Sequence, residues 1–301
     1  MASRFTRIVS VAVATLALAV GACAAGSDAP ATVAAASRDT TAAQPKKLAP
    51  FRVPSESEIG DSVTLASVRR GRAIIHSTRD SLPVHVGASL SCANCHIADG
   101  TQRDAMPLIA SYARFPQFRG RSGMVDLIED RINDCFERSM NGRALAPDSQ
   151  DMRDIVAYLA FLSRGFPVGG DMEGQGVPAL EPLRGDTTRG RAVFAVNCVA
   201  CHGADGHGTV AAPPLWGPRS FNIGAGMARL NSAARFIHQL MPRDRPGILT
   251  PQQAYDVAAY ITSRPRPDFA GKENDWPHGG APPDVAYRTR SAHARPIRSG
   301  Q

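Results

Sequence analysis

The chain has 301 residues, of which 43% are hydrophobic, 20% charged and 6% aromatic. This composition excludes a fibrous or wholly disordered protein, and the length allows about two domains. The formal net charge of +7 favours an anionic partner, but Arg residues are scattered among acidic residues, so nucleic acid is not an expected partner.

The N-terminus has the pattern of an export signal. Arg4 and Arg7 precede an apolar run over residues 8–20, which ends in Gly-Ala-Cys at Cys23. Because this ending is similar to a bacterial lipobox, we predict a periplasmic protein with a lipid anchor at Cys23. A soluble periplasmic protein, released by an ordinary Ala-x-Ala cut, is the alternative. An uncleaved membrane anchor is disfavoured because the apolar run is barely long enough to span a bilayer.

The rest of the chain carries one pattern twice. Gly-Arg-Ala followed by two apolar residues begins at Gly71 and again at Gly190, and Cys-x-x-Cys-His follows at residues 92–96 and 198–202. Each copy then ends in a similar helix-forming segment of Asp, Tyr, Ala and aliphatic residues. Neither copy shows sustained alternation with period two. We therefore predict an all-α fold of two tandem domains.

The domain boundaries follow from this duplication and from stretches rich in Pro and Gly. In chain order we predict a signal peptide with a lipobox-like end over residues 1–23, a disordered tether over 24–52, a first domain over 53–166, a linker over 167–183, a second domain over 184–266 and a C-terminal extension over 267–301. The extension is expected to cover the surface without a core of its own.

Cys-x-x-Cys-His is the attachment signature of a c-type haem. The two cysteines form thioether bonds to the haem vinyl groups, and the histidine becomes the proximal iron ligand. These residues are Cys92, Cys95 and His96 in the first copy and Cys198, Cys201 and His202 in the second. A zinc site would need Cys pairs close in sequence, and a redox disulfide would need a βαβ context. The sequence thus predicts two class I cytochrome c-like domains, each around a covalently attached haem.

The second haem is predicted to take Met241 as its distal ligand. Met-Pro lies just before the last helix of the domain, where cytochrome c domains usually supply this residue. Met227 is a weaker candidate because it lies early in the domain, inside a helix expected over residues 225–239. His238, one turn from Met241, is a third candidate.

Spacing alone does not decide the distal ligand of the first haem. Cys135 follows His96 by the same 39 residues that separate Met241 from His202, whereas Met140 fits slightly better when counted back from the closing helix. His85 is a further candidate. The remaining histidines are interpreted as solvated or structural; they are His76, His207, His278 and His293.

The neighbours of Cys135 carry more information than its spacing. A helix expected over residues 125–140 places Arg131, Cys135 and Ser139 on one face. A cation one turn before a thiol and a hydroxyl one turn after it favour the thiolate form. A structural cysteine in the core beside a solvated arginine is the alternative interpretation.

In these residues the chain resembles the dihaem, tetrathionate-forming thiosulfate dehydrogenases. The similarity extends from about residue 53 to residue 287, and its most specific segment is residues 131–142. The resemblance implies that Cys135 is the distal ligand of a catalytic first haem. It also implies that Arg121, Arg131 and Ser139 are active-site residues. Some family members exchange the distal Met of the second haem for an adjacent Lys; Leu240 stands there in this chain, so that exchange is not expected.

The resemblance implies that two thiosulfate ions are joined into tetrathionate. Electrons would pass from the first haem to the second and on to a cytochrome c, a high-potential iron–sulfur protein or an oxidase. Two dianions about 5 Å apart at an effective dielectric near 20 repel each other by on the order of 13 kcal/mol. Cations such as Arg121 and Arg131 must offset much of this repulsion. In the family, Cys135 would bond transiently to the sulfane sulfur.

Two alternative functions stay open from the sequence. A pure electron-transfer dihaem cytochrome c would need neither Arg131 nor Cys135. A tetrathionate reductase would use the same residues in the opposite direction, because the direction depends on haem potentials that the sequence does not determine.

Overall fold

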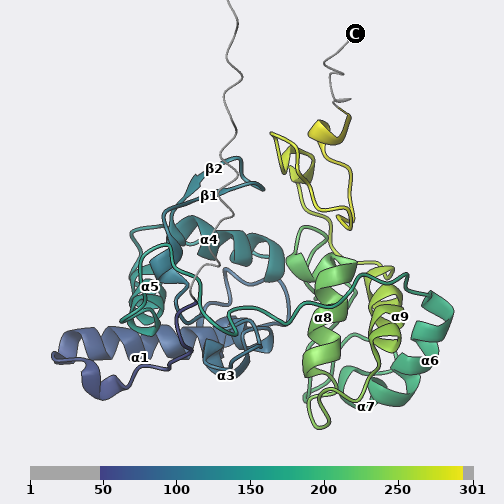
Figure 1. The fold of residues 1–301 in the computed structure, drawn as a ribbon, viewed down its shortest axis with the longest axis horizontal. Helices are drawn as coiled ribbons and strands as arrows, with labels where there is room; N and C mark the ends of the chain where they lie inside the picture. The colour runs from purple at the N-terminus through teal and green to yellow at the C-terminus, as the bar shows by residue number, and fades with distance from the viewer. Residues whose placement is uncertain (1–47, 294–301) are drawn as a thin grey trace, which may run out of the picture. The chain divides into compact units, whose positions relative to one another are not determined.

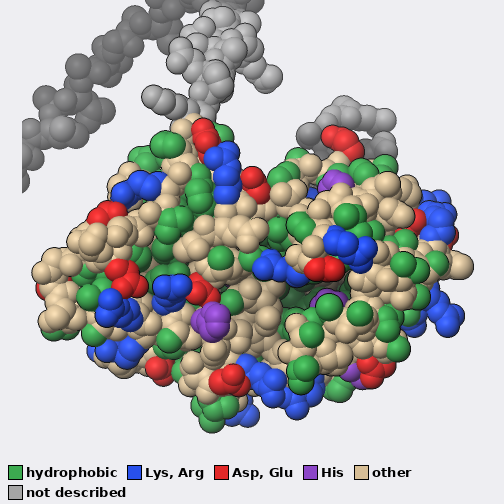
Figure 2. All heavy atoms as spheres, turned by 90° about the horizontal axis from the view of Figure 1, so that it is seen from below, with side chains coloured by type: hydrophobic (Ala, Val, Ile, Leu, Met, Phe, Trp, Pro, Cys, Tyr) green, Lys and Arg blue, Asp and Glu red, His purple; other side chains and the backbone are tan. Residues whose placement is uncertain are grey.

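Helices from both halves of the chain form the framework of the computed structural model, which describes residues 48–293, and turns and loops make up more than half of it (Figure 1). The predicted signal peptide with Cys23, and the predicted tether up to residue 47, lie outside the described residues. Within residues 48–293, no helix combines the length and the apolar character that a membrane span requires. On the face drawn in Figure 2, Lys and Arg side chains are interspersed with Asp and Glu.

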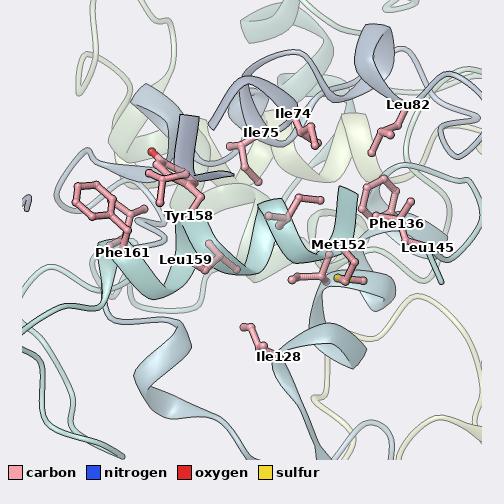
Figure 3. Close-up of a cluster of buried hydrophobic side chains, with 14 of the residues drawn as sticks. Ile74, Ile75, Leu82, Ile128, Phe136, Leu145, Met152, Tyr158, Leu159 and Phe161 are labelled. Atoms are coloured by element: carbon pink, nitrogen blue, oxygen red, sulfur yellow. The ribbon is translucent and has the colours of Figure 1, made fainter. Parts of the chain in front are cut away.

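The first domain is organised around two long helices. They are α1 (Ser62–His76) and α5 (Gln150–Leu162), which pack against each other. The shorter elements are α2 (Thr78–Ser81), α3 (Ile97–Gly100), α4 (Ile128–Asp134) and the strands β1 (Gln117–Arg119) and β2 (Met124–Asp126). Ile74 and Ile75 of α1 meet Met152 and Leu159 of α5 in a buried core that Phe136 also joins (Figure 3).

The second domain repeats this arrangement with fewer additions. It contains α6 (Thr187–Asn197), α7 (Val199–His202), α8 (Leu230–Leu240) and α9 (Pro251–Thr262). Helix α9 packs against both α6 and α8 (Figure 1). The rings of Phe194, Trp216 and Tyr260 meet in the core of the second domain, with their centroids 5.1–5.7 Å apart. Single 3-10 turns are Glu56–Glu58, Cys92–Asn94, Tyr112–Arg114, Gly226–Ala228, Lys272–Asn274 and Arg290–His293.

The duplicated glycine lies where two helices cross in each domain. A Cβ on Gly71 would lie 1.9 Å from the carbonyl oxygen of Asp154, and a Cβ on Gly190 would lie 1.9 Å from that of Asp256. Real atoms do not approach so closely, so only glycine allows α1 to contact α5 and α6 to contact α9 at this distance. The repeated Gly-Arg-Ala motif therefore has a packing cause.

The residue before each glycine adds a matching ion pair. Arg70 Nε lies 2.8 Å from Asp154 Oδ2, and Arg189 Nε lies 2.7 Å from Asp256 Oδ2. Both aspartates are almost fully buried, and an isolated carboxylate there would be costly. The arginine supplies the counter-ion from the same helix that makes the close contact.

We expect Gly71→Ala to lower the free energy of unfolding by about 1–3 kcal/mol, because its methyl group would overlap a backbone carbonyl that cannot rotate away. Denaturant unfolding of the haem-loaded protein measures this loss. Gly60→Ala is the matched control, since nothing lies within 4 Å of the position of its Cβ. Equal stability of the two variants would contradict the close helix crossing.

The helix expected over residues 125–140 begins later than predicted. β1 and β2 form an antiparallel hairpin that includes residues 124–126, so the all-α domain carries one small sheet. Asp130 Oδ2 accepts a hydrogen bond of 2.8 Å from the backbone N–H of Leu127, which starts the helix at Ile128. The five residues that follow α4, Cys135–Ser139, form a wider π-helical turn.

The helix expected over residues 225–239 is also shorter, because α8 begins at Leu230 after an extended Arg229. Asp284, from the C-terminal extension, accepts hydrogen bonds of 2.9 Å from Arg229 Nε and from the backbone N–H of Asn231. A carboxylate at the first turn of a helix stabilises that end. This cap comes from 53 residues away in the sequence, so local pattern could not locate the helix start.

Candidate active site

The first Cys-x-x-Cys-His lines a cavity of about 350 Å³. Cys92, Cys95 and His96 contribute one part of its lining, and Cys135 and Ser139 contribute another. Residues from the linker and the second domain, Val177 and Arg235 among them, complete the wall. The structure thus brings together residues that lie far apart in the sequence.

Both motif histidines are held in the same way. His96 Nδ1 donates a hydrogen bond of 2.6 Å to the backbone carbonyl of Met106, and His202 Nδ1 donates one of 2.8 Å to that of Pro213. Burial lowers the pKa of His96 and of His202, which keeps the rings neutral. With Nδ1 occupied, Nε2 carries the lone pair that can bind a metal.

Three of the four motif cysteines, Cys92, Cys95 and Cys198, are partly buried, and Cys201 is exposed. Burial raises the pKa of Cys92 to about 11 and that of Cys95 to about 12, and it raises the pKa of Cys198 to about 11. All five cysteines in the described part of the chain are free rather than disulfide-bonded. Paired thiols beside a neutral imidazole and a cavity are the donor set of a c-type haem, so these residues fit that group.

Cys135 lies beside a cation in the same cavity. Its Sγ accepts a hydrogen bond of 2.8 Å from Arg131 Nη1, and Arg131 is also 3.5 Å from Asp134. The charge of Cys135 is the largest cause that raises the pKa of the Arg131 guanidinium. The π-helical turn begins at this cysteine, and such turns are frequent at functional sites.

Met140, the competing candidate, also lines this cavity, but it is tied into the core of the first domain. Its carbonyl accepts hydrogen bonds from the backbone N–H groups of Gly87 and Ala88, and its side chain is only 4% exposed. His85 does not line the cavity, and its Nδ1 lies 3.3 Å from the carbonyl of Arg143. Cys135 as distal ligand stays a prediction.

A second cavity, of about 390 Å³, shares Arg131, Ser139 and Gly226 with the first. We call it the outer cavity. Its lining contains one carboxylate, Asp134, and five arginines, which are Arg119, Arg121, Arg131, Arg138 and Arg229. Arg121 and Arg131 are predicted site residues, whereas the other three arginines are not predicted from the sequence. The Arg-Gly-Arg pattern at residues 119–121 was a visible signal for one of them.

The C-terminal extension forms part of the wall of the outer cavity. Trp276 lines this cavity, and its ring centroid lies 4.9 Å from the guanidinium carbon of Arg121. The backbone N–H of Trp276 also donates a hydrogen bond of 2.8 Å to the carbonyl of Arg121. Arg121 Nη1 in turn donates to the carbonyl of Gly224 at 2.8 Å. The extension therefore does more than cover the surface, because it fixes an arginine at the cavity.

Arg138 fastens the extension to the first domain. Its two terminal nitrogens donate to the two carboxylate oxygens of Asp275 at 2.8 Å each, and its Nε donates to Asp134 at 2.5 Å. The guanidinium also stacks 4.1 Å from the centroid of the Phe269 ring. A bidentate pair with both partners nearly buried holds this wall rigidly.

In the second domain, Met241 follows the end of α8 and is partly buried. His238 Nδ1 donates a hydrogen bond of 2.9 Å to the carbonyl of Leu249, so that nitrogen is occupied. Met227 lies in a 3-10 turn rather than in the expected helix, and it lines the cavity of the first Cys-x-x-Cys-His motif. Met241 as distal ligand of the second haem stays a prediction.

Two protein-family models match the chain. "SoxA/TsdA, cytochrome c domain" matches residues 85–168, and "Cytochrome C oxidase, cbb3-type, subunit III" matches residues 185–261. These matches confirm the predicted fold of two tandem cytochrome c domains and c-type haem binding.

Curated relatives cover most of the chain. The thiosulfate dehydrogenase of Psychrobacter arcticus is 41% identical over 261 residues, which are 84% of this chain and 79% of the relative. That of Allochromatium vinosum is 43% identical over 234 residues, 74% of this chain and 87% of the relative. The solved thiosulfate dehydrogenase (TsdBA) of Marichromatium purpuratum is 36% identical with a TM-score of 0.71; the match covers 79% of this chain but only 55% of that one.

Proposed function

The chain belongs to the thiosulfate dehydrogenase family of cytochrome c oxidoreductases, and from this premise we propose that it oxidises two thiosulfate ions to one tetrathionate ion. The observation that carries the proposal is the Cys135 sulfur beside Arg131, in a cavity that shares residues with an arginine-lined outer cavity. The family match extends over both halves of the chain, so the resemblance seen in the sequence is confirmed.

The reaction balances without any proton. One S–S bond forms between the two sulfane sulfurs, no bond breaks, and two electrons leave. When bound, the two c-type haems would supply two one-electron acceptors, and we propose that electrons leave the first domain for the second and then an external acceptor protein. One would be attached at Cys92 and Cys95, the other at Cys198 and Cys201.

The described residues hold the anions and limit their repulsion. Arg131 donates from beside Cys135, where its guanidinium can bind the sulfonate oxygens of one thiosulfate. Ser139 lines both cavities and offers a hydroxyl donor. Arg121, fixed by Gly224 and Trp276, adds positive charge without having to be ordered when substrate binds.

An apolar cluster supports the proposed electron route. Ile97 and Phe236, from the two domains, belong to this cluster, and Met106 and Met241 both pack against it. The carbonyl of Met106 accepts the hydrogen bond from His96, and Met241 is the predicted distal ligand of the second haem. The cluster therefore links the surroundings of the two haem sites through packed apolar side chains.

We also propose that the protein works in the periplasm, anchored by lipid at Cys23. The support for this location is the export pattern of residues 1–23, together with the covalent haem motifs, because c-type haems are attached outside the bacterial cytoplasm. A soluble periplasmic form is the alternative.

Thiosulfate added to the oxidised, haem-loaded protein is expected to reduce its haems and to yield one tetrathionate for every two electrons. Optical spectroscopy follows the haems, and ion chromatography follows the product. Absence of reduction from acid to neutral pH would leave the pure electron-transfer cytochrome as the function. Protein-film voltammetry with thiosulfate and with tetrathionate tests the direction, and a dominant reductive current would identify a tetrathionate reductase.

A further inference from the structure

Four of the five arginines in the outer cavity are occupied by hydrogen bonds. Arg131 donates to Cys135, Arg121 to the carbonyl of Gly224, Arg138 to Asp275, and Arg229 to Asp284. Arg119 differs from them. Within residues 48–293, its side chain makes no hydrogen bond and no ion pair, although it is half-buried and lines the cavity.

The backbone of Arg119 is held firmly while its side chain is left available. It is the last residue of β1, and its carbonyl accepts hydrogen bonds from the N–H of Gly123 and the hydroxyl of Ser122. The hairpin turn rests on the C-terminal extension, because a Cβ on Gly123 would lie 2.4 Å from Pro277. A fixed hairpin therefore presents this guanidinium to the cavity.

The charge of Arg119 is poorly compensated. Burial lowers the pKa of its guanidinium, and the positive charge of Arg131 lowers it further; Asp134 and Asp126 act in the opposite sense. A dianion bound here would stabilise the charged form of Arg119, which is half-buried and close to a second cation. The volume of about 390 Å³ is within the range of small-molecule sites.

We propose that Arg119 binds the second of the two thiosulfate ions, in the outer cavity, while Arg131 and Ser139 hold the first beside Cys135. This inference rests on the proposed function, which requires two dianions to be present together. Arg131 is already engaged with Cys135, so the second anion needs another donor, and the unoccupied fork of Arg119 fits a sulfonate group. The S–S bond then forms between an inner and an outer ion.

Calorimetric titration of thiosulfate into the reduced, haem-loaded protein measures binding without turnover, because reduced haems accept no electrons. The wild-type protein is expected to bind two thiosulfate ions. Arg119→Gln is expected to weaken one of the two sites by about 10- to 100-fold, and Arg119→Lys to weaken it less. Arg153→Gln is the matched control, because it removes the same charge from an exposed position on α5 outside both cavities.

In turnover, Arg119→Gln is expected to raise the KM for thiosulfate by about tenfold or more with little change in kcat. A single thiosulfate site in the wild-type protein, or two unchanged sites in Arg119→Gln, would overturn the inference. Its failure is distinguishable from that of the proposed function. A protein that binds two ions, loses one with Arg119→Gln and yet is not reduced by thiosulfate would keep the subsite and lose the dehydrogenase activity.

Discussion

Replacing Cys135 with Gly or Met is expected to remove nearly all thiosulfate oxidation while both haems stay attached. Attachment needs only Cys92, Cys95, Cys198 and Cys201, whereas Cys135 places its sulfur at Arg131 in the proposed reaction cavity. If Cys135 is the distal ligand, Cys135→Met should raise the potential of the first haem, because a thioether donates less electron density than a thiolate. Cys135→Gly should instead open the sixth position.

Low-temperature EPR of the oxidised protein distinguishes thiolate–imidazole from thioether–imidazole iron, and redox titration measures the potentials. Haem content per chain is the internal control for folding and attachment. Met140→Leu is the matched variant, since it removes the competing thioether and keeps an apolar side chain in the core. A Cys135→Ala protein with an unchanged EPR spectrum and full turnover would show that Cys135 is neither ligand nor reactive group.

Arg131→Ala is expected to lower kcat/KM for thiosulfate by about 10- to 150-fold, which corresponds to about 1.5–3 kcal/mol for a charge-assisted hydrogen bond. The loss has a direct cause, because Arg131 lines both cavities and its guanidinium can hold the sulfonate group next to Cys135. The optical spectra of the haems are expected to change little, since the motif residues are untouched.

Steady-state kinetics at several thiosulfate concentrations measure this loss. Arg131→Lys tests the geometry, because an ammonium keeps the charge but cannot form two parallel hydrogen bonds, so it should recover only part of the rate. Arg153→Ala, exposed on α5, controls for a general change in net charge. An Arg131→Ala enzyme with wild-type kcat/KM would remove this residue from the site.

Local chemistry explains what could be predicted well. Cys-x-x-Cys-His places two thiols and an imidazole within five residues, so the haem motif is complete in the sequence without any tertiary contact. The duplication was visible for the same reason, and the structure explains why its glycine recurs, because Gly71 and Gly190 occupy the close helix crossings. The order of Arg131, Cys135 and Ser139 on one helical face was likewise a local property.

Helix starts were predicted less well, because distant side chains decide them. Asp284 caps α8 from the C-terminal extension, and no periodicity within residues 225–239 could reveal it. The exposed hairpin before α4 has too few residues to show a pattern of alternation, so the helix expected from residue 125 begins at Ile128.

A duplicated, haem-attaching chain with a cysteine between a cation and a hydroxyl could be predicted from the sequence alone, because each of these features lies within a few turns of backbone. The surroundings of that cysteine, in contrast, depend on tertiary contacts. Arg119 and Arg138 reach the outer cavity from the hairpin and the π-helical turn, and the extension closes it through Trp276. Cavities and the pairing of buried charges depend on contacts between segments more than 100 residues apart, such as Arg138 with Asp275, and chain order alone does not specify those contacts.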